Sequence, residues 1–220
     1  MAHMKKLKQS IFPAIILLAM GLNGQSQAAV IPFTNDAAFQ AALGSSVIYN
    51  FDSFALNQGP DVFGSFQTLD QQIPGINFDN ARVNLGAFGG TFHSSPNVVL
   101  NADFINPIIM TFATPQFAVG LYNSSLGDAE RFDIFDASNN LLGSINLPSQ
   151  VVNFGGFISD TGIARAMVTP IAPTNGSIYI DDLTLGTPTA AVPEPAVTWL
   201  FGSGLLLLFG RFGSGYKRRA

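Results

Sequence analysis

The stretch RFDIFDASNNLLGSINL, residues 131–147, decides the fold class of this chain. Within its first five residues (RFDIF), polar and apolar side chains alternate as far as Ile134, as in a strand with one buried face. Residues 136–140 (DASNN) are typical of a hairpin loop, and a second β-prone run follows at 141–147. The stretch therefore predicts two antiparallel strands joined by a short turn.

The same pattern continues on both sides of this hairpin. Residues 177–181 (SIYID) alternate in the same way, and the other β-prone runs are short and separated by Gly, Pro, Asn and Ser. One helix is expected at residues 35–43, capped by Thr34 or Asn35 and stopped at Gly44. The expected strands are 46–51, 76–78, 82–85, 97–100, 108–112, 117–122, 131–135, 141–147, 151–157, 164–169 and 177–185.

Since no helices alternate with these strands, we expect a mainly β fold, an antiparallel β-sandwich with one short N-terminal helix. The longest expected loops are residues 53–74 and 86–96, and long loops on a rigid sandwich are common places for binding.

The charge of the predicted β region differs from that of the whole chain. Residues 29–190 contain three arginines, no lysine and 13 acidic residues, a net charge of −10. Such a surface repels the phosphates of nucleic acids, so no nucleic-acid partner is expected. The chain has no cysteine, which excludes disulfides and thiolate metal sites.

The first 28 residues have the three parts of a secretory signal peptide. Lysines near the start form a basic region, residues 11–20 (IFPAIILLAM) form a short apolar region, and small residues at 26 and 28 suit cleavage after Ala28. We therefore expect residues 1–28 to be a signal peptide and residues 29–187 to be the folded, exported domain.

The C-terminal end has a second three-part pattern. The tetrapeptide Val192-Pro193-Glu194-Pro195 precedes an uncharged segment, residues 196–210 (AVTWLFGSGLLLLFG). As a helix, this segment would cover only about 22 Å, against a hydrocarbon core of about 30 Å. We expect residues 188–195 to be a linker and 196–220 to be a transmembrane helix with a basic, cytoplasmic tail. The basic residues that follow the apolar segment include Arg211, Arg218 and Arg219.

This ending resembles the PEP-CTERM sorting signal of Gram-negative bacteria, whose carriers are exosortase substrates. The resemblance implies an exported protein that is anchored in the inner membrane during sorting and then reaches the cell surface or the extracellular matrix. Its implied partners are exosortase-type sorting machinery, the membrane and exopolysaccharide or biofilm. An ordinary C-terminal membrane anchor is the alternative.

A second resemblance covers most of residues 29–187. Residues 39–44 (FQAALG) followed by 49–52 (YNFD) resemble the opening of many PEP-CTERM exported domains, and residues 178–183 (IYIDDL) are similar to the last strand of jelly-roll carbohydrate-binding modules. The resemblance implies a lectin-like, jelly-roll β-sandwich and a glycan ligand.

In those modules, acidic residues near the first and last strands often hold a structural Ca²⁺. The matching positions here are Asp52, Asp181 and Asp182. Because adjacent residues on a strand face opposite sides, only one of Asp181 and Asp182 can point at a given site unless the strand has a bulge. Ca²⁺ takes about six to eight oxygens, so Asn50 and backbone carbonyls would have to contribute. Solvated Asp residues at a strand end are the alternative.

Signatures of catalysis are weak in this sequence. No spacing singles out a pair of carboxylates as a glycosidase pair. His93 is the only histidine of residues 29–190, and no Gly-x-Ser-x-Gly motif accompanies it. We expect a non-catalytic protein in which His93 has a loop or structural role. A secreted hydrolase acting on polysaccharide is the alternative.

Aromatic residues in the two expected loops are candidates for ligand contacts, because aromatic rings stack on sugar rings. Covering the ends of the sandwich is their alternative role. The candidates are Phe63, Phe66, Phe88 and Phe92.

Overall fold

The computed structural model describes residues 29–61, 64–85, 92–124, 129–149, 151–171 and 176–189. The expected signal peptide, the Val-Pro-Glu-Pro motif, the apolar C-terminal segment and Arg211, Arg218 and Arg219 lie outside these residues. Within the described ranges, no helix has both the length and the apolar character that a membrane span requires.

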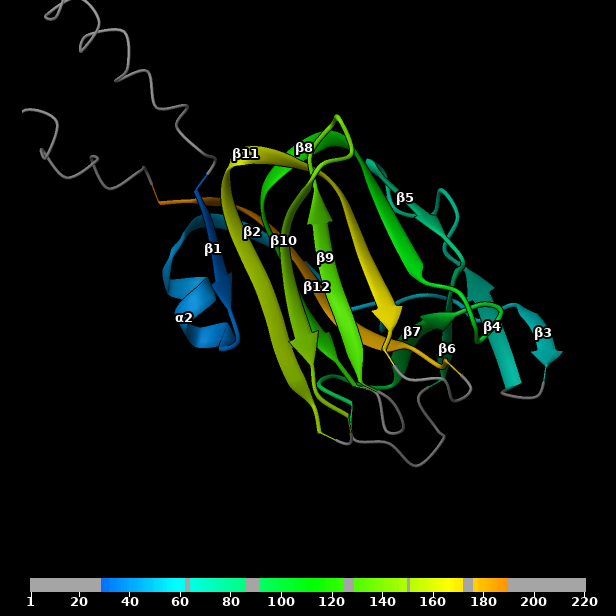
Figure 1. Ribbon diagram of the computed structural model, residues 1–220. Coiled ribbons are helices and arrows are strands. Elements are labelled where there is room, and N and C mark those ends of the chain that lie inside the picture. Colours follow the sequence, from blue (N-terminus) through cyan, green and yellow to red (C-terminus); the bar gives the residue numbers. More distant parts are fainter. Residues whose placement is uncertain are drawn as a thin grey trace, which may run out of the picture.

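Antiparallel strands make up most of the described chain, with a single short helix at one side (Figure 1). The mainly β, antiparallel fold expected from the sequence is confirmed, and it is consistent with a β-sandwich. The strands are β1 (Val30–Phe33), β2 (Leu43–Tyr49), β3 (Gln58–Asp61), β4 (Gly64–Thr68), β5 (Ile76–Asp79), β6 (Ala81–Leu85), β7 (Asn97–Asn101), β8 (Ile108–Asn123), β9 (Glu130–Phe135), β10 (Leu141–Leu147), β11 (Asn153–Pro170) and β12 (Tyr179–Pro188).

The hairpin predicted from residues 131–147 is present as β9 and β10, which pair from Phe135 opposite Leu141 to Glu130 opposite Leu147. Asp136 holds the turn, because its carboxylate accepts hydrogen bonds from the backbone N–H groups of Ser138 and Asn140, at 2.9 and 2.8 Å. The Asn140 side chain donates a third at 2.8 Å. Hydrogen bonds from Asn140 and Ser138 stabilise the ionised carboxylate and lower the pKa of Asp136.

Two long strands, β8 and β11, change neighbours along their length. Residues 153–158 of β11 pair with residues 118–123 of β8, and after a register shift residues 165–168 pair with 108–111. The first part of β11 also pairs with β1 and its last part with β9. Likewise, β5 pairs with the first part of β8 and β12 with its last part.

The sequence predicted two separate strands within each of these long strands, and that prediction was wrong. The polar residues between the apolar runs do not form turns in either case. In β11, the shift between Ile158 and Ile163 absorbs the irregularity while pairing with β8 continues on both sides. The main apolar core includes Phe132 of β9 and Phe157 of β11, whose rings lie 5.3 Å apart between centroids.

Helix α2 (Asp36–Ala41) is shorter than the expected helix at 35–43. It begins as predicted after Asn35, whose side chain accepts a hydrogen bond from the backbone N–H of Ala38 at 2.9 Å. It ends at Ala41, with Ala42 as its C-cap, and not at Gly44, because Leu43 is already the first residue of β2 and lies opposite Pro188 of β12. Pairing with β12 thus overrides the local helical pattern.

The side chain of Phe39 fixes α2 on the sheet. Its ring lies 5.5 Å from that of Phe33 and 5.2 Å from that of Phe154, measured between centroids. With Ala118 and Ile158 these residues form a second apolar cluster, separate from the main core. The helix therefore covers part of the sheet face that does not contact the main core.

The expected loop at residues 53–74 contains two strands, β3 and β4. β4 pairs with β6, which places Phe66 opposite Asn84. The sequence of β4 (GSFQT) has a single large apolar residue, so its local pattern gives no strand signal. Its strand conformation depends on hydrogen bonding to β6, a segment more than ten residues away in the chain.

We predict that Phe39→Ala destabilises the protein by about 3–5 kcal/mol, since the buried ring leaves a cavity between α2 and the sheet. Phe117→Ala, which truncates the same side chain at a position that is 40% exposed, is the matched control and should cost clearly less. Urea unfolding of both variants measures the difference. Equal losses would contradict this account of how α2 is held.

Candidate functional site

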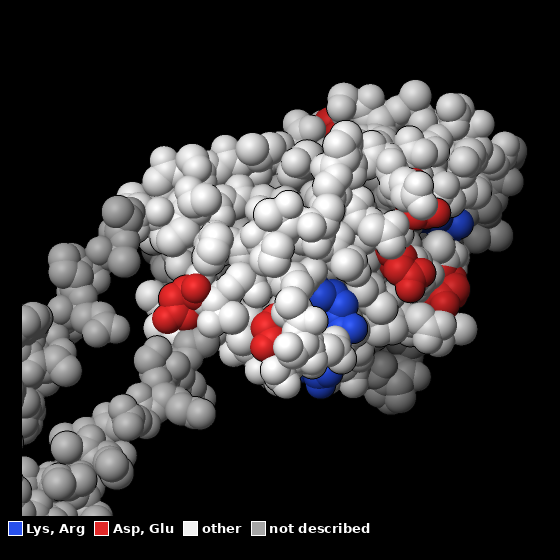
Figure 2. Space-filling model, turned by 90° about the horizontal axis from the view of Figure 1, so that it is seen from above, with Lys and Arg blue, Asp and Glu red and all other residues white. Residues whose placement is uncertain are grey.

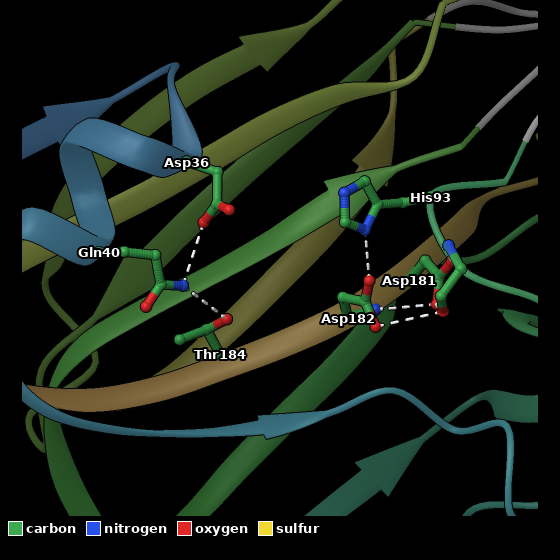
Figure 3. Close-up of polar contacts among 7 residues, drawn as sticks. Asp36, Gln40, His93, Asp181, Asp182 and Thr184 are labelled. Atoms are coloured by element: carbon green, nitrogen blue, oxygen red, sulfur yellow. Dashed lines mark hydrogen bonds and ion pairs between the residues drawn. The ribbon is translucent and has the colours of Figure 1, made fainter.

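A group of polar side chains lies beside α2 on the sheet face that carries the second apolar cluster (Figure 3). Its members come from four segments that are far apart in the sequence. We call this group the carboxylate–histidine cluster. It consists of Asp36 and Gln40 of α2, His93 and Ser94 from the segment before β7, Tyr122 of β8, and Asp181, Asp182 and Thr184 of β12.

A bulge in β12 turns two adjacent carboxylates toward one partner. The register between β12 and β8 shifts between Asp181 and Thr184, and Asp182 has a φ of 46°, in the left-handed region. As a result, the Ser94 hydroxyl lies 3.1 Å from Oδ1 of Asp181 and 3.2 Å from Oδ1 of Asp182. Adjacent strand residues can share a site only at a bulge, and β12 has such a bulge at Asp181 and Asp182.

The expected calcium ligands hold the segment that precedes β7. The backbone N–H of Ser94 donates to Oδ2 of Asp181 at 2.7 Å, and the backbone N–H of Asn97 donates to Oδ1 of Asp52 at 3.0 Å. The Asn97 side chain also donates to the carbonyl oxygens of Phe51 and Asp52, at 3.1 and 3.2 Å. Asp52 and Asp181 thus fasten the two ends of residues 94–97.

In this arrangement the three carboxylates accept hydrogen bonds from N–H and O–H groups of the protein. Across the described residues, no group of three or more His, Asp or Glu side chains is placed to hold a metal ion. A cation at Asp181 and Asp182 would have to take most of its oxygens from backbone carbonyls, water or a ligand. Calcium binding stays a prediction.

His93 contacts members of the cluster on two strands, Asp182 of β12 and Tyr122 of β8. Its Nδ1 contacts Oδ2 of Asp182, and its ring stacks on that of Tyr122 with centroids 3.4 Å apart and planes inclined by 12°. The His93 side chain is 40% exposed, against 12% for Asp182. A nucleophilic triad would need a serine hydroxyl bonded to the imidazole. The Ser94 hydroxyl is bonded to the two carboxylates instead.

Tyr122 lies between two acidic groups. Burial, together with its hydrogen bond to Asp36 and the negative charges of Asp36 and Asp182, raises the pKa of Tyr122 to about 12. Asp36 also accepts a hydrogen bond from Nε2 of Gln40 at 3.0 Å, and the same nitrogen lies 3.5 Å from the Thr184 hydroxyl. The α2 end of the cluster is therefore a connected set of hydrogen bonds.

Burial raises the pKa of Asp181 to about 6, and the negative charge of Asp182 adds to this rise. Hydrogen bonds from the backbone and hydroxyl of Ser94 and from the backbone of Asp182 act in the opposite direction but do not cancel it. The side chain has no solvent exposure. Asp181 is therefore the cluster's buried carboxyl, and it changes charge near pH 6.

The candidate aromatic residues do not gather in one loop. Phe66 lies in β4, not in a loop as predicted, and its ring faces the Arg82 guanidinium, whose carbon is 5.0 Å from the ring centroid. The ring centroid of Phe104 lies 4.6 Å from the same guanidinium carbon of Arg82. Phe92 packs near Tyr179, with centroids 6.5 Å apart. Phe63 and Phe88 lie outside the described residues.

The sequence pointed to only part of this cluster. The Asp181-Asp182 pair was identified from the last strand, and His93 was noted as the single histidine of the domain. Asp36, Gln40, Tyr122 and Thr184 were missed, because each is an ordinary residue in its local sequence. Only the packing of α2 on the sheet and the pairing of β8 with β12 bring them beside His93.

On the face shown in Figure 2, charged side chains form small separate groups on a mainly uncharged surface. All three arginines of the domain contact other residues of the protein, and the guanidinium of the buried Arg82 faces the rings of Phe66 and Phe104. Arg131 pairs with Asp133 at 2.8 Å, and the Arg165 guanidinium carbon lies 4.2 Å from the centroid of Phe135. The described residues thus show no basic patch that would suit a polyanion.

Neither a protein-family model nor a curated protein sequence matches this chain. Among solved structures, a DUF4465 family protein from Bacteroides caccae is 13% identical, with a TM-score of 0.42; the match covers 64% of this chain and 98% of that chain. The enzymatically active domain of tailspike protein 4 of bacteriophage CBA120 is 11% identical, with a TM-score of 0.20, and the match covers 73% and 18% of the two chains.

The buried carboxyl of Asp181 should make stability depend on pH. The pKa of Asp181 is about 6 in the folded protein and near 3.8 in the unfolded chain. Its contribution to the free energy of unfolding is therefore fully present below about pH 4 and is lost as the pH rises to about 6. Over this window the free energy of unfolding should fall by roughly 3 kcal/mol. We therefore expect Asp181→Asn to become more stable relative to the native protein over this pH window.

Urea unfolding at several pH values measures this difference, and Asp160→Asn, at an exposed position of β11, controls for the loss of one carboxylate. A stability difference between Asp181→Asn and the native protein that stays constant across the window would show that Asp181 does not titrate there.

Proposed function

We propose that this chain is an exported, non-catalytic protein of the cell surface or extracellular matrix that binds polysaccharide at the carboxylate–histidine cluster. The signal-peptide pattern and the PEP-CTERM-like ending support export and sorting by exosortase-type machinery. They also support anchoring in the inner membrane of a Gram-negative bacterium before release to the surface or biofilm. The antiparallel β fold is compatible with the lectin-like jelly roll that the resemblance implies.

The observation that carries the binding proposal is the exposed His93 ring, which contacts Asp182 and stacks on Tyr122, a residue that is itself hydrogen-bonded to Asp36. A sugar presents many hydroxyl donors, and carboxylate and amide oxygens accept hydrogen bonds from them. The ring and its acceptors are held in place before any ligand arrives, which lowers the entropy cost of binding. A few fixed polar groups beside an aromatic surface are typical of small-molecule sites.

The charge of the cluster narrows the class of polysaccharide. Asp36, Asp181 and Asp182 are acidic, His93 is the only side chain of the cluster that can become a cation, and the domain carries a net charge of −10. A chain rich in uronic acids would be repelled. We therefore propose a neutral polysaccharide as the ligand.

The arrangement of the two adjacent carboxylates supports a non-catalytic role. Asp181 is fully buried, and Ser94 occupies the space between Asp181 and Asp182. A glycosidase needs its two carboxyl groups on opposite sides of a sugar bond. One observation favours the alternative of a secreted polysaccharide hydrolase, namely the raised pKa of Asp181, which is a property of general acids.

We predict that Asp36→Asn weakens binding of a neutral polysaccharide by about tenfold, because a charged acceptor of a sugar hydroxyl is lost. Affinity electrophoresis through polysaccharide gels measures this, with the exposed Asp160→Asn as the control that should bind normally. Unchanged binding by Asp36→Asn would overturn the assignment of the site. Release of reducing sugar that Asp181→Asn abolishes, with the melting temperature retained, would establish the hydrolase instead.

Calcium is part of this proposal, as a structural ion at Asp181 and Asp182, while Asp52 holds the backbone N–H of Asn97 at the start of β7. A cation that binds only the folded state stabilises that state by mass action. We expect millimolar Ca²⁺ to raise the melting temperature by several degrees relative to EDTA, and Asp181→Asn to abolish the rise. An identical melting temperature in both conditions would remove calcium from the proposal and leave polysaccharide binding to be tested separately.

A further inference from the structure

His93 belongs to a short segment that is fastened to the domain at two places. The first is Ser94, which donates its backbone N–H to Asp181 and whose hydroxyl lies within hydrogen-bond distance of both Asp181 and Asp182. The second is Asn97, the first residue of β7, which is 3% exposed. Since the His93 side chain is 40% exposed, its position depends on how firmly this segment is held.

Asn97 ties the segment to the turn that follows β2. Its side-chain amide donates to the carbonyl oxygens of Phe51 and Asp52, at 3.1 and 3.2 Å. Its backbone N–H donates to Oδ1 of Asp52 at 3.0 Å. A buried donor that loses its partner is costly, so the turn and the start of β7 are held together.

A strained backbone position lies at each of the two anchors. Phe51 has a φ of 59° and Asp182 a φ of 46°, both in the left-handed region that side chains other than those of Gly and Asn rarely adopt. Packing fixes the first of them, since the Phe51 ring is buried 6.3 Å from that of Phe78. Conformations of this kind persist where the surrounding structure imposes them, and they are common at ligand-binding sites.

Residues 94–97 have little freedom between these anchors. Pro96 lies in the middle of them, and a proline ring fixes φ at about −65°. Ser94 and Asn97, at the two ends, are each held by more than one hydrogen bond. A displacement of Asn97 is therefore passed along the segment to Ser94 and His93.

We propose that Asp52 and Asn97 are positioning residues of the polysaccharide site, although neither is a member of the carboxylate–histidine cluster. Through residues 94–97 they keep the His93 ring stacked on Tyr122. The effect on affinity rests on the proposed function, whereas the position of the ring can be measured without a ligand. Asp52 thereby acts on the site through the chain and not as a ligand-contacting group.

Two substitutions of Asp52 separate its hydrogen bond from its charge. Asp52→Ala and Asp52→Asn both remove the negative charge, but only Asp52→Asn keeps a side-chain oxygen that can accept the backbone N–H of Asn97. NMR of the full chain in detergent, with EDTA present so that calcium does not contribute, measures the stacking. The ring current of His93 shifts the ring protons of Tyr122, and His93→Ala defines the unstacked value.

We expect Asp52→Ala to move the Tyr122 signals toward the unstacked value and Asp52→Asn to leave them near the native value. Asn97→Asp keeps the shape of the side chain but cannot donate to the two carbonyls, and it should move the signals in the same direction as Asp52→Ala. Native Tyr122 signals in Asp52→Ala and in Asn97→Asp would overturn the proposal.

A purely structural role for Asp52 predicts a different binding result. Loss of stability alone leaves the affinity of the folded molecules unchanged at temperatures well below the melting temperature. We expect Asp52→Ala to bind about fivefold more weakly there, with Asp52→Asn restoring the native affinity. Affinity electrophoresis through gels of dextran, galactomannan and xyloglucan, three neutral polysaccharides, measures this. Asp160→Ala, at an exposed position of β11, is the control and should bind normally.

The two measurements separate this inference from the proposed function. Native affinity in Asp52→Ala would show that Asp52 does not position the site, while binding by the native protein would still support the proposed function. A native protein that none of the three gels retards would overturn the proposed function and the effect on affinity. The Tyr122 signals would then still decide whether Asp52 and Asn97 hold the His93 ring.

Discussion

The antiparallel pairing of β8 with β11 is the interaction on which the other elements depend. β8 pairs with β5 and β12, and β11 pairs with β1 and β9, each at a different part of the long strand. Four further strands are therefore attached to this one continuous pair of strands. One face of this pair supports the main core through Phe157, and the other supports α2 through Phe154. The position of Asp36 on α2 thus follows from the same pairing that builds the core.

The scarcity of cations explains the character of the site. With no lysine in residues 29–190, most acidic side chains of the described domain are stabilised by amide, hydroxyl and backbone donors. At Asp181 these donors do not offset the effect of burial, so its pKa rises. Burial, the hydrogen bond to Asp36 and the negative charges of Asp36 and Asp182 together raise the pKa of Tyr122.

The cluster and β2 meet on β12. Thr184, which lies near Gln40 in the cluster, is opposite Ile48 of β2.

The sequence by itself determined the strand-rich class, the hairpin at 131–147 and the start of the helix at Asn35, since these depend on side-chain alternation, turn chemistry and capping between residues close in the chain. It also determined the low number of cations. The tertiary structure decided where α2 ends, because Leu43 is taken by pairing with Pro188, and it made β4 a strand through pairing with β6. It alone formed the bulge at Asp182 and brought His93, Tyr122 and Asp36 together. These features depend on contacts between segments distant in the chain, and no local pattern encodes such contacts.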